Sequence, residues 1–183
     1  MVLVDFHPPE ALRGEIVILR RYRMTDSAAV KDAIAASLES LQKWMPWAQS
    51  EPTDQSVMSF LGPAVAQFGG DAAANYAITL RDSGDYIGGC SLMPRIGPGA
   101  LEVGYWVHTA HQRRGIATES ARLVTNAAFE LPGIRRVEIH CDERNVASAN
   151  VARTLGFRLD RIMPGPTELV AGNSMIWITD QSV

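Results

Sequence analysis

Six consecutive residues carry the types that bind a phosphate group: Gln112, Arg113, Arg114, Gly115, Ile116 and Ala117. They follow an apolar, strand-like run at residues 101–108 and precede a helical pattern that starts near Thr118. A tight loop between a strand and a helix turns unpaired backbone N–H groups toward one point, and the helix dipole adds partial positive charge there. The glycine and the small alanine let an anion approach the backbone, and the two arginines add charge at the rim. The segment predicts a phosphate-binding turn, although by itself it is equally compatible with an ordinary strand–helix turn that carries exposed arginines.

Motif and composition exclude several other classes of protein. A Walker loop and a dinucleotide-binding turn both need more glycines than this segment has. The 183 residues carry 17 Lys and Arg against 20 Asp and Glu, a formal net charge of -3, which does not indicate a nucleic-acid-binding protein. The sequence has no apolar run of membrane-spanning length and no signal-peptide pattern, and Cys90 and Cys141 show no zinc or redox spacing. We expect two buried free thiols and a location in the reducing cytoplasm.

The periodicity of apolar residues divides the chain into the elements that must position this turn. Strand-like runs lie at residues 16–19, 75–81, 86–92, 101–108, 136–141, 157–162 and 175–179. Helical patterns lie at residues 25–42, 53–68, 118–131 and 146–155. Turn residues at 82–85 and 97–99 predict an antiparallel meander, whereas the third helix predicts parallel pairing of the strands before and after it. The fold class is therefore α/β, a central twisted mixed sheet of about seven strands flanked by about four helices.

Four motifs in this order resemble those of one enzyme superfamily. They are Leu19-Arg20 before Thr25-Asp26, the linker Trp44-Met45-Pro46-Trp47, QxxGxA at 112–117, and NxxSxNVxRxLGF at 145–157. Over roughly residues 14–180 the chain resembles the GNAT superfamily of N-acetyltransferases, and more narrowly its RimJ/RimL branch of ribosomal-protein N-terminal acetyltransferases. The resemblance implies a GNAT-like fold over residues 1–183 as a single domain, with residues 1–13 as a flexible N-terminal segment. It also implies a splayed gap between the strands at 101–108 and 136–141.

The implied co-substrate is acetyl-CoA, with its pantetheine arm in that gap. The resemblance assigns backbone groups to the arm and the pyrophosphate, and gives the Val107 N–H the task of polarising the thioester carbonyl. The residues expected to bind acetyl-CoA are Trp106, Val107, His108, Gln112, Arg113, Arg114, Gly115, Ile116, Ala117, Thr118, Asn145, Asn150 and Arg153. For Asn150 and Arg153, a role as solvated helix-surface residues is an equal alternative. Arg113 stands where the family often has Gly, and Ala117 where many members have a second Gly.

Two residues are expected to be catalytic. Glu102 lies in an otherwise apolar strand, where burial is expected to raise the pKa of its carboxyl toward that of a base useful near neutral pH. The matching glutamate is proposed as the base in RimL-like enzymes, and the alternative is a solvent-facing strand residue. Because Ala152 occupies the position of the family's usual tyrosine acid, Ser148 is expected to protonate the departing thiolate. Its alternative role is to cap or pack its helix.

The acceptor site is less well defined by the sequence. Trp44, Met45 and Trp47 lie in a loop that the family places over the acceptor site, although core packing is a simpler role for them. Tyr105 and Trp106 alternate across their strand, so one is expected to pack in the core and the other to face a helix or the acceptor cleft, and Tyr105 is taken as the acceptor-site candidate. His108 and His111 lack further ligands nearby, so no metal is expected. The acceptor is an amine on a protein N-terminus or on a small molecule such as a polyamine, aminoglycoside or amino acid. The loop at 38–52 and the segment at 163–174 are expected to decide between them.

A different class of function remains open at this stage. A non-catalytic acyl-CoA-binding module would keep the phosphate turn and Asn145 but lack a placed base and acid. The presence of Glu102 and Ser148 favours the enzyme. No nucleic acid or membrane partner is expected, and the resemblance implies a homodimer.

Overall fold

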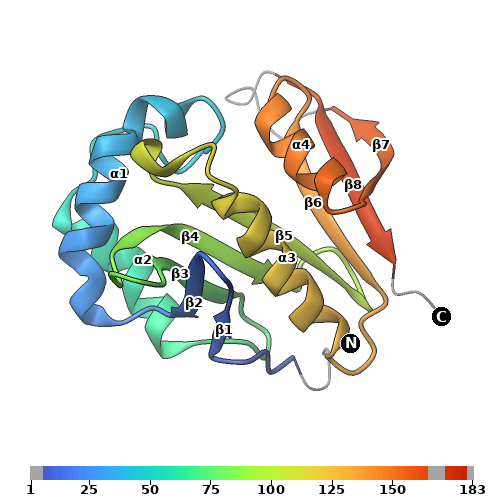
Figure 1. Ribbon diagram of the computed structural model, residues 1–183, viewed down its shortest axis with the longest axis horizontal. Helices are drawn as coiled ribbons and strands as arrows, with labels where there is room; N and C mark the ends of the chain where they lie inside the picture. Colours follow the sequence, from blue (N-terminus) through green and yellow to red (C-terminus); the bar gives the residue numbers. More distant parts are fainter. Residues whose placement is uncertain (1–5, 165–171, 181–183) are drawn as a thin grey trace.

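The computed structural model describes residues 6–164 and 172–180, and it places an open, mixed sheet at the centre of the molecule (Figure 1). Within these residues the sheet has eight strands in the order β1-β2-β3-β4-β5-β6-β8-β7. The strands are β1 (Ala11–Arg13), β2 (Val17–Arg21), β3 (Ala74–Leu80), β4 (Tyr86–Met93), β5 (Ala100–Val107), β6 (Arg136–Asp142), β7 (Arg158–Met163) and β8 (Ser174–Asp180). The α-helices are α1 (Ser27–Gln42), α2 (Asp54–Ala66), α3 (Ile116–Phe129) and α4 (Val146–Thr154), and the short 3-10 turns are η1 (Met24–Asp26) and η2 (Thr109–His111).

Apolar side chains cover both faces of the first half of the sheet. Tyr76 and Ile78 of β3 belong to a large cluster that also contains residues of α3 and α4. Ala77, between them, belongs to a second cluster with residues of α1 and α2. Because successive side chains of a strand point to opposite faces, α3 and α4 cover one face and α1 and α2 cover the other.

The predicted topology is confirmed. Strands β2 to β5 form an antiparallel meander, and β5 pairs with β6 in parallel across helix α3. The predicted elements match the observed ones to within about two residues, a normal scatter for element ends. The mixed sheet flanked by helices is the expected α/β class, with one strand more than the sequence indicates.

The additional strand lies in the N-terminal segment. Residues 11–13, which the sequence analysis assigns to a flexible segment, pair with β2 as the edge strand β1. Phe6 is also buried in the large cluster. A three-residue edge strand is too short to show a period of two, so the sequence pattern does not reveal it.

Two other expectations bear on the whole chain. Cys90 and Cys141 are buried free thiols, as predicted. Among the helices of the described residues, none is long and apolar enough to cross a membrane.

Candidate functional site: a split between two parallel strands

Strands β5 and β6 pair over only half of their length. Their register runs from Ala100 opposite Arg136 to Val103 opposite Ile139. Beyond these residues the two strands diverge, β5 toward η2 and β6 toward α4 (Figure 1). The split lies between the two strands for which the sequence predicts a splayed gap.

One backbone amide is directed toward the split by the register of β5 on β4. The His108 N–H donates to the Ile87 carbonyl at 2.8 Å, so it is used within the sheet. Successive N–H groups of a strand point to opposite sides, and Val107 stands opposite Gly88 in the β4–β5 pair. The Val107 N–H therefore points away from β4, toward the split. Trp106 and His108, which were also expected to bind the pantetheine arm, turn their N–H groups toward β4.

The N-terminus of α3 lies at the same end of β5. Gly115 is the N-cap with φ 77°, and no side chain of the described residues caps the helix. The first intrahelical bond runs from the Glu119 N–H to the Gly115 carbonyl at 2.9 Å. The N–H groups of Ile116, Ala117 and Thr118 therefore have no intrahelical acceptor, which is the arrangement that binds anions.

The loop before α3 is open to solvent. Residues 112–115 are exposed, and a side chain built at Gly115 would meet only the Ile16 Cδ1 atom, at 4.0 Å. The Gln112 side chain donates to the Val107 carbonyl at 3.4 Å and to the Ser40 hydroxyl at 3.3 Å, which ties the loop to β5 and α1. The turn predicted to bind phosphate is thus accessible, and the residues present fit a diphosphate.

Glu119 fixes the start of α3, a role that the sequence analysis missed. Its buried carboxylate accepts the N–H groups of Glu15, Ile16 and Val17 at 2.8, 2.9 and 2.9 Å. These three bonds join the first turn of α3 to the turn that leads into β2. The partners lie more than a hundred residues apart in sequence, so only the folded chain reveals them.

Three side chains meet on the α4 side of the split. The Tyr105 hydroxyl lies 2.9 Å from the Ser148 hydroxyl, and the Cys141 thiol also bonds to Ser148. Burial raises the pKa of Tyr105, so its phenol is neutral and able to donate a proton. Burial likewise raises the pKa of the Cys141 thiol.

Asn145 holds Ser148 in place as the N-cap of α4. Its side-chain oxygen accepts the Ser148 N–H at 3.1 Å, so its amide N–H groups are the ones that remain to donate to a ligand. Asn150 and Arg153 are exposed and bond to each other at 2.9 Å, and the Arg153 guanidinium stacks over Trp177 at 4.9 Å. These contacts favour the helix-surface role over acetyl-CoA binding for Asn150 and Arg153.

Glu102 is on the opposite face of β5. Its side chain is 6% exposed, which removes the alternative of a solvent-facing residue. Its carboxylate accepts two hydrogen bonds from the Arg95 guanidinium, at 2.8 and 2.5 Å. The sequence analysis did not anticipate Arg95, whose positive charge is paired with the buried carboxylate.

Aromatic residues gather around Trp106, which is on the same face of β5 as Glu102 but four residues further along the strand. Trp106 contacts Trp47, with ring centroids 6.2 Å apart, and Tyr86 at 6.1 Å. Trp47 is 54% exposed, whereas Trp44 and Met45 are half-buried. Residues 165–171 of the predicted acceptor rim lie outside the described residues. Trp106 and Trp47 thus contribute an aromatic surface to this face, whereas Tyr105 reaches the α4 side instead.

Two histidines at the end of β5 contact each other. The rings of His108 and His111 lie 5.6 Å apart in a T-shaped contact. Burial and the neighbouring His111 lower the pKa of His108. Within residues 6–164 and 172–180, no group of three or more His, Cys, Asp or Glu side chains could hold a metal ion.

The sequence was compared with known proteins. The family model described as an acetyltransferase (GNAT) domain matches residues 17–158. The uncharacterized N-acetyltransferase YnaD of Bacillus subtilis (strain 168) is 24% identical over 142 residues, which cover 78% of this chain and 79% of YnaD.

Solved structures share the fold. RimL, a ribosomal L7/L12 alpha-N-protein acetyltransferase in complex with coenzyme A, superimposes with a TM-score of 0.79 at 22% identity, covering 93% of this chain and 98% of RimL. MccE, a microcin C7 self-immunity acetyltransferase in complex with acetyl-CoA and AMP, superimposes with a TM-score of 0.81 at 18% identity, covering 91% and 93% of the two chains.

The split sheet and the uncapped helix are thus found in a chain whose fold and sequence define an acetyltransferase. Since the family model spans most of its length, the chain belongs to the GNAT acetyltransferase family.

Proposed function

We propose that this protein transfers the acetyl group of acetyl-CoA to the α-amine of a protein N-terminus, as a RimJ/RimL-like enzyme. The observation that carries the proposal is the split between β5 and β6, with the Val107 amide turned toward it and the uncapped N-terminus of α3 at the same end. Acetyl-CoA supplies an activated thioester, and the backbone at Ile116–Thr118 is suited to hold its diphosphate. We further propose that residues 1–183 form a single domain and that the protein is a homodimer in the cytoplasm.

The choice of acceptor is supported by relatives and by the aromatic surface. RimL acts on a protein α-amine, and its fold covers nearly all of this chain. The exposed Trp47 beside Trp106 offers an apolar surface on the same face of β5 as Glu102, suited to the first side chains of a peptide. MccE, an immunity acetyltransferase with the same fold, favours a small-molecule amine as the second candidate.

The proposed mechanism assigns one task to each group. Glu102 takes a proton from the acceptor ammonium, and the amine attacks the thioester carbonyl carbon directly. The Val107 N–H donates to the carbonyl oxygen as negative charge develops on it. Ser148 donates a proton to the departing thiolate and is replenished by the neutral Tyr105 phenol at 2.9 Å; the second proton of the amine, lost as the amide forms, passes to water, and water reprotonates Tyr105. In this assignment Tyr105 supports the acid, in place of the family's tyrosine at the position of Ala152.

Arg95 gives a physical reason for a cationic acceptor. Its guanidinium occupies the bidentate position on the Glu102 carboxylate, but its side chain is 63% exposed, and the proposal requires it to move aside toward solvent. An ammonium group that enters the site replaces one positive charge with another, so the buried carboxylate never loses its counter-charge.

The first experiment is an acceptor screen that measures thiol release from acetyl-CoA. Short peptides with a free N-terminus are compared with the same peptides blocked at the N-terminus, and with polyamines, aminoglycosides and amino acids. We expect turnover with free peptides and none after blocking. Turnover of small amines alone would replace the first candidate by the second, and tight coenzyme A binding without any turnover would contradict the proposed reaction.

Glu102→Gln tests the assignment of the base. The variant keeps the shape of the side chain but cannot accept a proton, so we expect turnover to fall by about 100-fold. The affinity for acetyl-CoA, measured by calorimetry, is expected to stay within about twofold, because the base acts on the acceptor and not on the donor. Glu39→Gln is the control, since the Glu39 side chain is 94% exposed. Equal turnover of Glu102→Gln and the control would remove Glu102 from the mechanism.

A further inference from the structure

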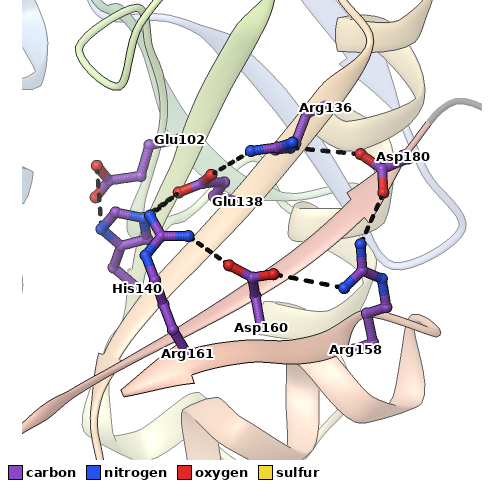
Figure 2. A network of polar contacts seen from close by, with 8 residues as sticks. All are labelled: Glu102, Arg136, Glu138, His140, Arg158, Asp160, Arg161 and Asp180. Carbon is purple, nitrogen blue, oxygen red and sulfur yellow. Dashed lines mark hydrogen bonds and ion pairs between the residues drawn. The ribbon is translucent and has the colours of Figure 1, made fainter. Parts of the chain in front are cut away.

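His140 lies between two buried carboxylates at the mouth of the split (Figure 2). It is the residue of β6 that follows the last paired position, Ile139. Its Nε2 atom is 2.7 Å from the Glu138 carboxylate, and its Nδ1 atom is 3.6 Å from the Glu102 carboxylate. The two carboxylates are 4% and 6% exposed, whereas the imidazole is 25% exposed. Among these three groups, the imidazole is the one in contact with solvent.

The two distances define the tautomer of the imidazole. A neutral imidazole carries one N–H, and a hydrogen bond needs a separation near 2.7–3.2 Å. Only the contact with Glu138 has that length. The proton of neutral His140 therefore belongs on Nε2, donated to Glu138, and the lone pair of Nδ1 faces Glu102.

The Glu138 carboxylate is part of a closed ring of alternating acidic and basic side chains (Figure 2). Arg136 and Arg161 lie 3.6 and 4.0 Å from its carboxylate. The ring runs through Glu138, Arg136, Asp180, Arg158, Asp160 and Arg161. Because the ring spans β6, β7 and β8, Glu138 is a fixed acceptor for the Nε2 proton and orients the ring of His140.

Among the described residues, the other charged groups that pair with Glu102 or Glu138 are arginines. Arg95 on Glu102 and the arginines of the ring are guanidinium groups without a free lone pair. Asp142, two residues further along β6, is bonded to Arg144, and that bond lowers the pKa of its carboxyl. His140 is thus the described neighbour of Glu102 whose ring nitrogen offers a free lone pair.

We propose that His140 is a positioning residue that takes the acceptor's proton from Glu102 and passes it to water, with Glu138 fixing its tautomer. The inference rests on the proposed role of Glu102 as the base. First the N–H bond of the acceptor ammonium breaks and an O–H bond forms on Glu102. That O–H bond then breaks as a bond forms between the proton and Nδ1 of His140, and Glu138 balances the charge of the imidazolium. Loss of the Nδ1 proton to water restores both groups for the next turnover.

Chemical rescue is the first test. In His140→Ala we expect kcat with the peptide acceptor to fall at least about tenfold, while the KM for acetyl-CoA is unchanged. Added imidazole should restore kcat in a saturable way, and more strongly as the pH rises and more of the imidazole is neutral. His7→Ala, which removes an exposed histidine, is the control. It should keep its activity, and added imidazole should not change its kcat. A purely structural role for His140 predicts no rescue, and unchanged kcat or absent rescue would overturn the proposal.

The second test does not depend on turnover. Nitrogen chemical shifts of His140 in the wild-type protein report which ring nitrogen carries the proton. We expect the Nε2–H tautomer in the wild-type protein, and a weaker preference in Glu138→Gln. A dominant Nδ1–H tautomer in the wild-type protein would contradict the relay even if the enzyme is active. If the tautomer is as expected but no amine is acetylated, the proposed function fails while the geometry of the relay stands.

Discussion

Two backbone conformations shape the loop in front of α3. Arg113 has φ 61° and Gly115 has φ 77°, both in the left-handed region. For Gly115 this conformation has little cost, whereas for an arginine it costs about 1–2 kcal/mol. The loop therefore keeps a cationic side chain at a position where glycine would be less strained. An exposed guanidinium beside unpaired N–H groups is favourable where a diphosphate binds, which gives the strain a functional reason.

The turn can be tested with two variants of equal shape. Gly115→Asp and Gly115→Asn both introduce a side chain that tolerates a positive φ better than most. Only the aspartate places a negative charge against the diphosphate, so we expect it to weaken acetyl-CoA binding by about tenfold more than the asparagine does. Calorimetric titrations at low and high salt measure the difference, which should shrink as salt screens the charge. Equal losses in the two variants would mean that no anion binds at this turn.

The position of α3 as an element depends on one side chain. Three backbone N–H groups of the turn before β2 converge on the Glu119 carboxylate. Gly14 leaves room for it, because a Cβ atom there would lie 2.6 Å from the carboxyl group. Glu119 thereby aims the N-terminus of the helix, and with it the dipole, at the end of β5.

Glu119→Gln should weaken both the fold and the site. An amide has one oxygen in place of two, and its NH2 group would face backbone N–H groups, so we expect a loss of about 2–3 kcal/mol in the free energy of unfolding. Urea unfolding measures that loss, and calorimetry should show weaker acetyl-CoA binding. Glu130→Gln, an exposed position at the other end of α3, serves as the control. A variant as stable as the control would show that the three bonds contribute little.

Local sequence patterns predict the elements better than they predict the partners of the site residues. The loop at 112–117 and the strand at 101–108 have a spacing that any strand–loop–helix unit shows, so both could be placed without coordinates. Arg95 and Glu102 also lie within reach in sequence, but a bidentate ion pair across a turn leaves no periodic signal. The contact between His140 and Glu102 requires that β6 lies beside β5 in one register, and no local pattern defines a register of parallel strands. The one signal that could have indicated the network is a second buried glutamate, Glu102, which lies opposite Glu138 in the β5–β6 pair.

At the scale of the whole molecule, arginines lower the pKa of three carboxyl groups. Burial alone would raise the pKa of Asp26, but hydrogen bonds from Arg20 and from the Arg23 N–H outweigh it and lower that pKa. A hydrogen bond from Arg161 lowers the pKa of Asp160. With Asp142 these carboxylates are ionised more readily in the folded chain than in the unfolded one.

These lowered pKa values predict acid-sensitive stability. A carboxyl whose folded pKa is depressed stabilises the fold above its unfolded pKa, near 3.8, and this stabilisation is lost as the pH falls through the folded value. We expect the free energy of unfolding to be nearly constant from pH 7 to 5 and to decline below about pH 4. Urea titrations at pH 7, 5 and 3 measure it. Asp26→Asn should flatten the decline and Asp71→Asn, an exposed position, should not; identical pH profiles for the two variants would contradict the role of Asp26.

The seam between β5 and β6 joins a block of five strands to a block of three through four facing residue pairs. The ladder at this seam is shorter than those of the β4–β5 and β6–β8 pairs on either side of it, and its unpaired stretch leaves backbone groups of both blocks without a ladder partner. An extended molecule laid along it fastens the blocks together and raises the stability of the whole chain by mass action. Amide hydrogens on both sides of the seam should therefore exchange more slowly as coenzyme A is added, including those of the three-stranded block on its far side.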